Sequence, residues 1–518
     1  MSLMQANADS FPVGKPDKGA LAVAKTGWLL AAAVLGFMLV LPEVITRPLF
    51  GDDAYYLWGA TQIYHGCYPI RDFYAIDPTG TWAYFCGTRF LFGDGSVGYW
   101  IMVTANVAIT GYLLGMLARD NANSLFAGIW TAFLFVMFQL RCTPAYALVG
   151  KDMLGFPFAL GGLLLATRSR WWFPAHLMVG IGLAIKPTLG ALWLVWMAGD
   201  FWQQRSQLVH WLLRAAVASV AIGIPFLAVT YWGELHAWGW AAFKVNVGLA
   251  SGNYGSYWSG ETLYKLIHAF VPMLWMLPLA ALALRSLQPF NLSRHLVLLS
   301  VLLGGLINWG IQPMFNSYYF IPFFGAITVL AGMGLVELLP GMSGQIAVMA
   351  CASMFFAFVP ATNLRWLKFV TDIKGREKYT LVEHQSRVMA QYALGNTPPY
   401  IQEWVRSEVS ELVGHDGRVG VLVTDGDLLW ALRAYRPGFW ADWSPAWNPQ
   451  RLAEGVASGS ADVIVGVEDV SSFTNSNIYY DQVAKLRWNV PEQAMRALHE
   501  DYQPVARRFG YVIYQRRK

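Results

Sequence analysis

The sequence predicts a polytopic α-helical membrane protein with a C-terminal, water-soluble α/β domain on the outer side of the membrane. Of the 518 residues, 56% are hydrophobic and only 13% are charged, against about 25% charged in ordinary soluble domains. The charge is also unevenly distributed. Residues 364–518 hold 37 of the 69 charged residues, about 24% of that segment, while residues 1–363 hold 32, about 9%. A single soluble domain and a disordered chain are therefore both excluded.

Eleven apolar segments are long enough to cross a hydrocarbon layer of about 30 Å. The block 173–201 is too long for one span and carries Lys186 and Pro187 near its middle, so we interpret it as two short helices that meet at a turn. The other nine predicted spans are 27–45, 97–117, 122–140, 147–167, 208–232, 269–284, 294–312, 317–339 and 344–363.

Basic residues orient these spans. Lys15, Lys18 and Lys25 precede the first span, and positive charge favours the cytoplasmic side, so the N-terminus is expected in the cytoplasm. With eleven spans, the loops that hold the later arginines also lie on the cytoplasmic side. If residues 173–201 formed a single span, the loop that holds Arg285 would lie on the outer side instead. The predicted divisions are a cytoplasmic tail 1–26, a transmembrane domain 27–363 with large outer loops at 46–96 and 233–268, and an outer domain 364–518.

Between and after the spans, the sequence predicts shorter elements. Residues 54–65 and 80–92 are aromatic and amphipathic, and are expected to lie along the membrane interface as short helices. Residues 364–410 are polar with a helical pattern and are expected to link the two domains. The outer domain is predicted as a small α/β module, with strands at 418–424, 461–467 and 511–514 and helices at 427–435 and 491–500.

Acidic residues gather in the first outer loop. Six of the 14 acidic residues of the membrane half lie between Glu43 and Asp94, and charge near a membrane is expensive enough to be informative. The adjacent Asp52 and Asp53 follow the first span, where they could serve as a general base or bind a cation or a basic partner. Alternatively, Asp52 caps a helix that begins at Ala54. Charge placement alone favours neither interpretation.

Other sequence features limit which cofactors and partners are expected. The net charge of +5 comes without a long basic run, so no nucleic-acid partner is expected. The nine histidines show no ligand spacing, so no built-in metal site is expected from them. We interpret Asp425 and Asp427 as part of a strand-to-helix turn with a capping aspartate. A disulfide between Cys67 and Cys86 is left open.

Several motifs occur in a fixed order along residues 27–340. They are Gly51-Asp52-Asp53-Ala54-Tyr55-Tyr56, Tyr68-Pro69-Ile70-Arg71-Asp72-Phe73, Asp77-Pro78, Gly150-Lys151-Asp152, Gly182-Leu183-Ala184-Ile185-Lys186-Pro187-Thr188 and Ser317-Tyr318-Tyr319-Phe320-Ile321-Pro322. Together with the topology, this set resembles the GT-C glycosyltransferases, in the branch of bacterial protein O-mannosyltransferases and lipid A aminoarabinose transferases. Two positions depart from that pattern: Asp53 replaces the usual glutamate, and Asn316-Ser317 stand where a basic residue is common.

The resemblance implies a transferase at the periplasmic face of an inner membrane. It would move a sugar from a polyprenyl-phosphate donor to a hydroxyl of a glycolipid, polysaccharide or protein acceptor, usually with inversion. Asp52 would accept the hydroxyl proton, beside Asp53. Cationic side chains would stabilise the departing phosphate. The candidate substrate-binding residues are Arg71, Asp72, Lys151, Asp152, Lys186, Tyr318 and Tyr319.

Each candidate also has a simpler interpretation. Lys186 could be a lysine that extends to the interface from a hairpin turn, Asp152 a helix cap, and Arg71 with Asp72 a local surface pair. The sequence leaves open whether the acid pair binds a divalent cation such as Mg²⁺, Mn²⁺ or Ca²⁺. Two rival functions also remain: a transporter or flippase for a lipid-linked glycan, and a membrane-anchored assembly protein.

Overall fold

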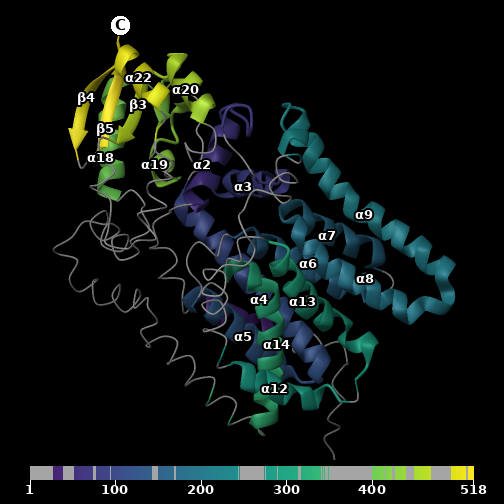
Figure 1. Ribbon diagram of the computed structural model, residues 1–518. Coiled ribbons are helices and arrows are strands. Elements are labelled where there is room, and N and C mark those ends of the chain that lie inside the picture. Colours follow the sequence, from purple (N-terminus) through teal and green to yellow (C-terminus); the bar gives the residue numbers. More distant parts are fainter. Residues whose placement is uncertain are drawn as a thin grey trace, which may run out of the picture.

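The computed structural model is a bundle of long helices with a small sheet domain at one end (Figure 1). It describes residues 27–38, 52–73, 77–93, 95–142, 150–167, 171–242, 276–288, 290–312, 317–339, 399–414, 416–422, 426–438, 449–467, 492–508 and 511–517, with isolated positions at 244, 274, 341, 344, 348 and 490. The side chains of Asp52, Asp53 and Tyr318 lie outside the described set. A helical membrane bundle joined to a small α/β domain is the predicted fold class, which is confirmed.

The helices of the bundle follow the predicted spans. After an unlabelled helix at Gly27–Met38, the elements are α2 (Asp52–Tyr64), α3 (Thr79–Phe92), α4 (Ser96–Ala122), α5 (Leu125–Cys142), α6 (Lys151–Ala166), α7 (Trp172–Ile185), η3 (Pro187–Leu189), α8 (Gly190–Gln204), η4 (Arg205–Gln207), α9 (Leu208–Glu234), α12 (Met276–Ser286), α13 (Leu292–Gly310), η6 (Ser317–Phe320) and α14 (Ile321–Leu338). Each predicted span up to residue 339 contains a helix. The span 344–363 falls almost wholly outside the described residues.

Length and composition single out the helices that could cross a membrane. Within the described part of the chain, four stretches are long and apolar enough: Gly98–Ala122, Pro187–Glu234, Leu292–Gly310 and Ile321–Leu338. Helix α9 stands at the edge of the bundle (Figure 1). Its side chains Val209, Leu213 and Tyr231 are between 64% and 73% exposed. An apolar face of this kind is costly in water and fits a lipid environment.

Helices α2 and α3 form where the sequence predicts two short helices, and both pack into the protein core. The residues from Ala54 to Gln62 are all buried, and Trp82 and Phe85 of α3 are fully enclosed. The reason is aromatic packing: the Tyr56 ring stacks on Phe85 with centroids 4.8 Å apart, and it meets Trp82 edge-on at 5.8 Å. That these helices lie along the membrane interface stays a prediction. Cys67 and Cys86 are both free thiols.

The C-terminal domain is built on a five-stranded sheet in the order β2-β1-β3-β5-β4. Strands β2, β1 and β3 are parallel, whereas β5 runs antiparallel to both β3 and β4. The strands are β1 (Arg418–Val421), β2 (Arg436–Pro437), β3 (Val463–Val467), β4 (Tyr502–Arg508) and β5 (Tyr511–Arg516), and the helices are α18 (Pro399–Leu412), α19 (Gly426–Ala431), α20 (Pro449–Ala457) and α22 (Glu492–Asp501).

Helix α2 joins the two domains. It packs against α3 on one side and against α19 of the outer domain on the other. The side-chain amide of Gln62, which is fully buried, donates hydrogen bonds to the carbonyls of Arg433 at 3.1 Å and Tyr435 at 3.2 Å. The helix that begins at Asp52 is therefore fixed to the outer domain through its C-terminal half.

Candidate functional site

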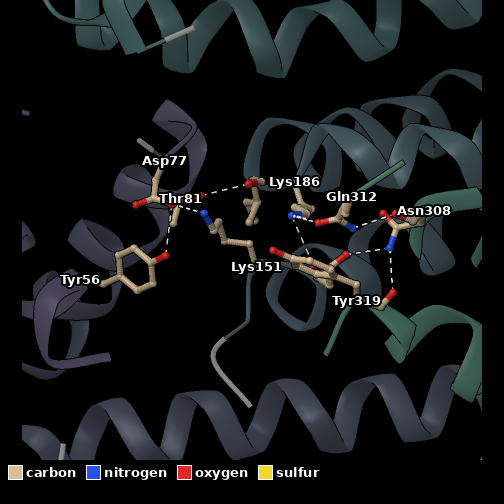
Figure 2. A network of polar contacts seen from close by, with 10 residues as sticks. Tyr56, Asp77, Thr81, Lys151, Lys186, Asn308, Gln312 and Tyr319 are labelled. Atoms are coloured by element: carbon tan, nitrogen blue, oxygen red, sulfur yellow. Dashed lines mark hydrogen bonds and ion pairs between the residues drawn. The ribbon is translucent and has the colours of Figure 1, made fainter. Parts of the chain in front are cut away.

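A network of charged and polar side chains lies inside the helical bundle (Figure 2). We call it the charged network. It consists of Tyr56, Asp77, Lys151, Asp152, Lys186, Asn308, Gln312 and Tyr319. Its members come from α2, the segment before α3, α6, the break after α7, the end of α13 with the residues that follow it, and η6, so the network brings together segments that are far apart in the sequence.

The first half of the network surrounds Asp77. This carboxylate, only 3% exposed, forms an ion pair with the ammonium group of Lys151 and accepts a hydrogen bond from the Tyr56 hydroxyl at 3.2 Å. Lys151 is the first residue of α6, which Gly150 precedes as the N-cap. The pair therefore links the segment before α3 to the start of a membrane helix.

The second half surrounds Lys186. Its Nζ lies 3.5 Å from Oδ2 of Asp152 and donates to Oε1 of Gln312 at 2.5 Å. It also lies 4.8 Å from the centroid of the Tyr319 ring, a distance at which the cation is attracted by the ring. Asp152 is completely buried, and its Oδ1 accepts from Asn308 at 2.8 Å. Among the described residues its Oδ2 accepts no hydrogen bond, so this oxygen is held by the ion pair alone.

A break in the helix positions Lys186. Pro187 disfavours helical geometry at the residue before it, and Lys186 accordingly adopts an extended conformation at φ −140° and ψ 94°. Thr81 donates from Oγ1 to the carbonyl of Ile185 at 3.0 Å. The backbones pack so closely here that a Cβ on Gly80 would lie 2.3 Å from the carbonyl oxygen of Ala184. The start of α3 is therefore fixed against the end of α7.

The electrostatics favour a functional site. The network contains two carboxylates and two ammonium groups, so it is neutral as a whole, with exposed fractions of 22% for Lys151 and 12% for Lys186. Burying charges costs several kcal/mol per ion even when they are paired, and ionisable groups within membrane helices are rare outside functional sites. A network of this kind can bind an anionic group and stabilise developing negative charge.

The structure brings together four of the predicted substrate-binding residues: Lys151, Asp152, Lys186 and Tyr319. Asp152 lies against Lys186, while Lys151 contacts Asp77. Asp152 is also not a helix cap, because Gly150 occupies that position.

Arg71 and Asp72 lie apart from the charged network. Arg71 donates from Nε at 2.9 Å and from Nη2 at 2.6 Å to Oδ2 of Asp72, and its side chain is half exposed. This hydrogen bond raises the pKa of Arg71 above its ordinary value. Arg71 also donates to the carbonyl of Gly66 at 2.9 Å. The contacts are those of the local surface pair that the sequence left as an alternative.

Asp52 and Asp53 open helix α2, one turn before Tyr56. Their side chains, like that of Tyr318, lie outside the described set. Among the side chains that are described, no group of three or more His, Cys, Asp or Glu residues could hold a metal ion.

Sequence reasoning missed several members of the network. Asp77 and Tyr56 belong to the short motifs but have no predicted role, and Asn308 and Gln312 belong to none of these motifs. Asn308 lies in the last turn of α13, and Gln312 follows two residues after the helix ends and donates to the carbonyl of Asn308 at 2.9 Å. Two amides at the end of an apolar span were a signal that could have found them.

Comparisons with solved structures identify the fold. ArnT from Cupriavidus metallidurans bound to undecaprenyl phosphate aligns with a TM-score of 0.55 and 16% identity, covering 94% of this chain and 98% of that one. The apo state of ArnT aligns with a TM-score of 0.52 and 17% identity, covering 95% and 98%. An oligosaccharyltransferase from Archaeoglobus fulgidus, tethered with an acceptor peptide, aligns at 0.45 and 11%, covering 95% and 74%.

No protein-family model matches the sequence, and no curated protein matches it significantly. ArnT, the lipid A aminoarabinose transferase, is a member of the GT-C superfamily. Its likeness spans nearly the whole of both chains. The chain therefore has the fold of the GT-C membrane glycosyltransferases, as the sequence motifs led us to expect.

Proposed function

Because the chain combines the GT-C fold with a charged network inside its membrane bundle, we propose that it is an integral membrane glycosyltransferase. It moves a sugar from a polyprenyl-phosphate donor to an acceptor hydroxyl at the periplasmic face of the inner membrane. The observation that carries this proposal is the pair of mostly buried lysines, Lys151 and Lys186, each of which lies beside a carboxylate inside the bundle. ArnT, which shares the fold, was crystallised with undecaprenyl phosphate bound.

The lysines suit the departing phosphate. Transfer converts a phosphodiester into a phosphate monoester, whose second ionisation adds negative charge as the bond breaks. An ammonium group has three N–H donors, so Lys186 can keep Gln312 and Asp152 as partners and still donate to a phosphate oxygen. In a water-poor site, fixed positive charge stabilises developing negative charge far more than it does in water.

The acceptor hydroxyl requires a base, and we assign that role to Asp52. The hydroxyl oxygen attacks the anomeric carbon while the bond from that carbon to the phosphate oxygen breaks and the lipid phosphate leaves with the electron pair. The hydroxyl proton passes to the Asp52 carboxylate. A single displacement inverts the anomeric centre. Support comes from chain position: Asp52 precedes Tyr56 by one turn of α2, and the Tyr56 hydroxyl donates into the charged network.

A transfer assay with purified protein tests the proposal. The enzyme in detergent, given radiolabelled polyprenyl-phosphate sugar and delipidated or lipid-containing membrane extracts, is expected to produce a labelled acceptor without any vesicle present. The fraction that carries the label identifies the acceptor as protein, polysaccharide or glycolipid. In a parallel assay with the protein in vesicles, label that crosses the vesicle membrane with no product formed would instead support a transporter. No product and no transport would favour an assembly role.

The variant Lys186→Met makes the assay specific. It keeps the length of the side chain and removes the charge, so we expect the transfer rate to fall by at least about 100-fold, the loss typical of a removed transition-state donor. Lys244→Met, at an exposed lysine outside the network, is the matched control and should transfer at the wild-type rate. Equal rates for the two variants would exclude Lys186 from the site.

A further inference from the structure

A cavity lies where α2 meets the outer domain, apart from the charged network. Its volume is about 670 Å³, which is within the range of small-molecule sites, roughly 300–1,000 Å³. Thr61 of α2 and His65, the residue that follows this helix, form one wall. Side chains of α18 and the segment after α19 form the other, with Arg406 and Arg433 among them.

The cavity is lined by groups that bind anions. Arg433 is held in place, because its guanidinium group stacks 4.0 Å from the centroid of the Trp430 ring and its Nη1 donates to the Trp430 carbonyl at 3.0 Å. Arg406 is exposed, and no carboxylate of the described residues forms an ion pair with it. A guanidinium group matches phosphate and carboxylate oxygens in pairs. Glu403 is the single carboxylate of the lining.

The positive charge of Arg406 acts on Tyr435, another residue that lines the cavity. Burial raises the pKa of Tyr435 above its ordinary value, and the positive charge of Arg406 opposes that rise. The hydroxyl of Ser407 and the ring of His65 add further polar groups to the lining. The cavity thus combines two guanidinium groups with hydroxyl and aromatic surface, a combination that suits an anionic group on a body of the size of a sugar.

The cavity also spans a junction. Its walls are joined by Gln62, whose amide donates to the carbonyls of Arg433 and Tyr435. A ligand held by α2 and by both arginines would add contacts across the same junction. It would therefore stabilise the docking of the outer domain on the helix that begins at Asp52.

We propose that this cavity binds a small anionic ligand, with a phosphate or carboxylate group on a sugar-sized body, and that the ligand joins α2 to the outer domain. The phosphate could belong to a soluble sugar phosphate or to a lipid headgroup. Both present the same chemistry to Arg406 and Arg433. The proposal goes beyond the transfer reaction and does not depend on it, because it concerns equilibrium binding at a separate place.

Binding to the purified full-length protein in nanodiscs tests the proposal without any donor or transfer. Glucose 6-phosphate is the soluble probe, with glucose and inorganic phosphate as comparisons, and calorimetry with melting temperature gives the readout. We expect saturable binding of glucose 6-phosphate with a Kd below about 1 mM, a raised melting temperature, and at least tenfold weaker binding of glucose. Nanodiscs with phosphatidylglycerol in place of phosphatidylcholine form the second arm, and a melting temperature raised there alone identifies a headgroup as the source.

Variants locate the ligand. Arg406→Gln and Arg433→Gln should each weaken the effective probe at least tenfold, whereas Arg496→Gln should leave binding unchanged. Arg496 is a suitable control, because it is 68% exposed on α22 and pairs with Glu492 outside the cavity. Arg406→Lys keeps the positive charge and should retain part of the affinity for the probe. It therefore controls for a folding defect in Arg406→Gln. If neither probe binds, or if Arg406→Gln and Arg433→Gln both bind as the wild type does, the proposal is wrong, whatever the transfer assay shows.

Discussion

Each lysine of the charged network lies beside a carboxylate, Lys151 with Asp77 and Lys186 with Asp152. Removing one partner of a buried pair leaves an uncompensated charge, which costs more than the pair itself contributes. The carboxylates therefore compensate the charge of both lysines inside the bundle. The amides of Asn308 and Gln312 complete the hydrogen bonds that a carboxylate and an ammonium need away from water.

The Asp77–Lys151 pair can be tested through stability. Asp77→Asn removes the carboxylate that forms an ion pair with Lys151, and with Lys151 only 22% exposed we expect a loss of about 3 kcal/mol in the free energy of unfolding, seen as a lower melting temperature at a fixed heating rate. The double variant Asp77→Asn with Lys151→Gln should recover most of that loss, because both charges of the ion pair are then removed together. Both variants should transfer poorly. A double variant that melts no higher than Asp77→Asn would contradict the ion pair.

Asp52 carries the sharpest prediction for catalysis. Asp52→Asn keeps the shape of the side chain and removes its charge, so transfer by the purified enzyme should fall by about 10²–10⁴-fold, the usual contribution of a general base, with the melting temperature near that of the wild type. Asp53→Asn should cost less. If the two carboxylates instead share a divalent cation, EDTA should abolish wild-type transfer and Mg²⁺, Mn²⁺ or Ca²⁺ should restore it. Near-normal transfer by Asp52→Asn would rule out the assignment.

Short motifs identified Lys151, Asp152, Lys186 and Tyr319 as site candidates, and the structure brings all four into the charged network. The pairing could not be predicted in the same way. Asp152 meets Asn308 across 156 positions of the chain, and Lys186 meets Gln312 across 126, so the partners follow from helix packing that no local pattern encodes.

At the scale of elements, the contact between α3 and α7 decides where the network forms. Gly80 allows the backbones to approach, Thr81 bonds to Ile185, and Lys186 follows directly. Since Asp77 precedes α3 by two residues, a shift of this helix would move Asp77 away from Lys151. The close approach therefore connects local packing to the electrostatics of the site.

Two glycines on the same helix test this contact. Gly80→Ala places a methyl group 2.3 Å from a backbone oxygen that cannot move aside, so we expect a loss of about 1–3 kcal/mol from overpacking and slower transfer. Gly87→Ala meets nothing within 4 Å and should raise stability by up to about 1 kcal/mol through helix propensity. Melting temperature and transfer rate measure both. If the two variants had the same melting temperature and transfer rate, the close contact between α3 and α7 at Gly80 would be contradicted.

The sequence predicted elements well where periodicity is strong. The spans up to residue 339, the strands β1, β3 and β5, and the helices α19 and α22 all lie where the apolar patterns placed them. Strands β2 and β4 were missed for physical reasons: β2 has only two residues, and β4, at the edge of the sheet, is largely exposed and shows no alternation. Burial of α2 and α3 was missed because their aromatic residues fit an interface or a core equally well.

At the scale of the whole molecule, the connection through α2 constrains topology. The helix begins after the first predicted span and ends against the outer domain through Gln62. The loop that holds Asp52 and the domain that holds the C-terminus must therefore lie on the same side of the membrane. The turn between α4 and α5, where Arg119 lies, belongs to the opposite side in the eleven-span scheme.

Reporter fusions test that orientation. We expect a reporter that is active only in the periplasm to give signal when fused after Lys518, because eleven spans from a cytoplasmic N-terminus end outside. A fluorescent protein that matures only in the cytoplasm should give signal when fused after Asn123, the left-handed residue that ends α4. Exchanging the two reporters should silence both positions, which controls for expression. A C-terminal fusion that is active only in the cytoplasm would overturn the span count, and it would also place Asp52 on the side away from a periplasmic acceptor.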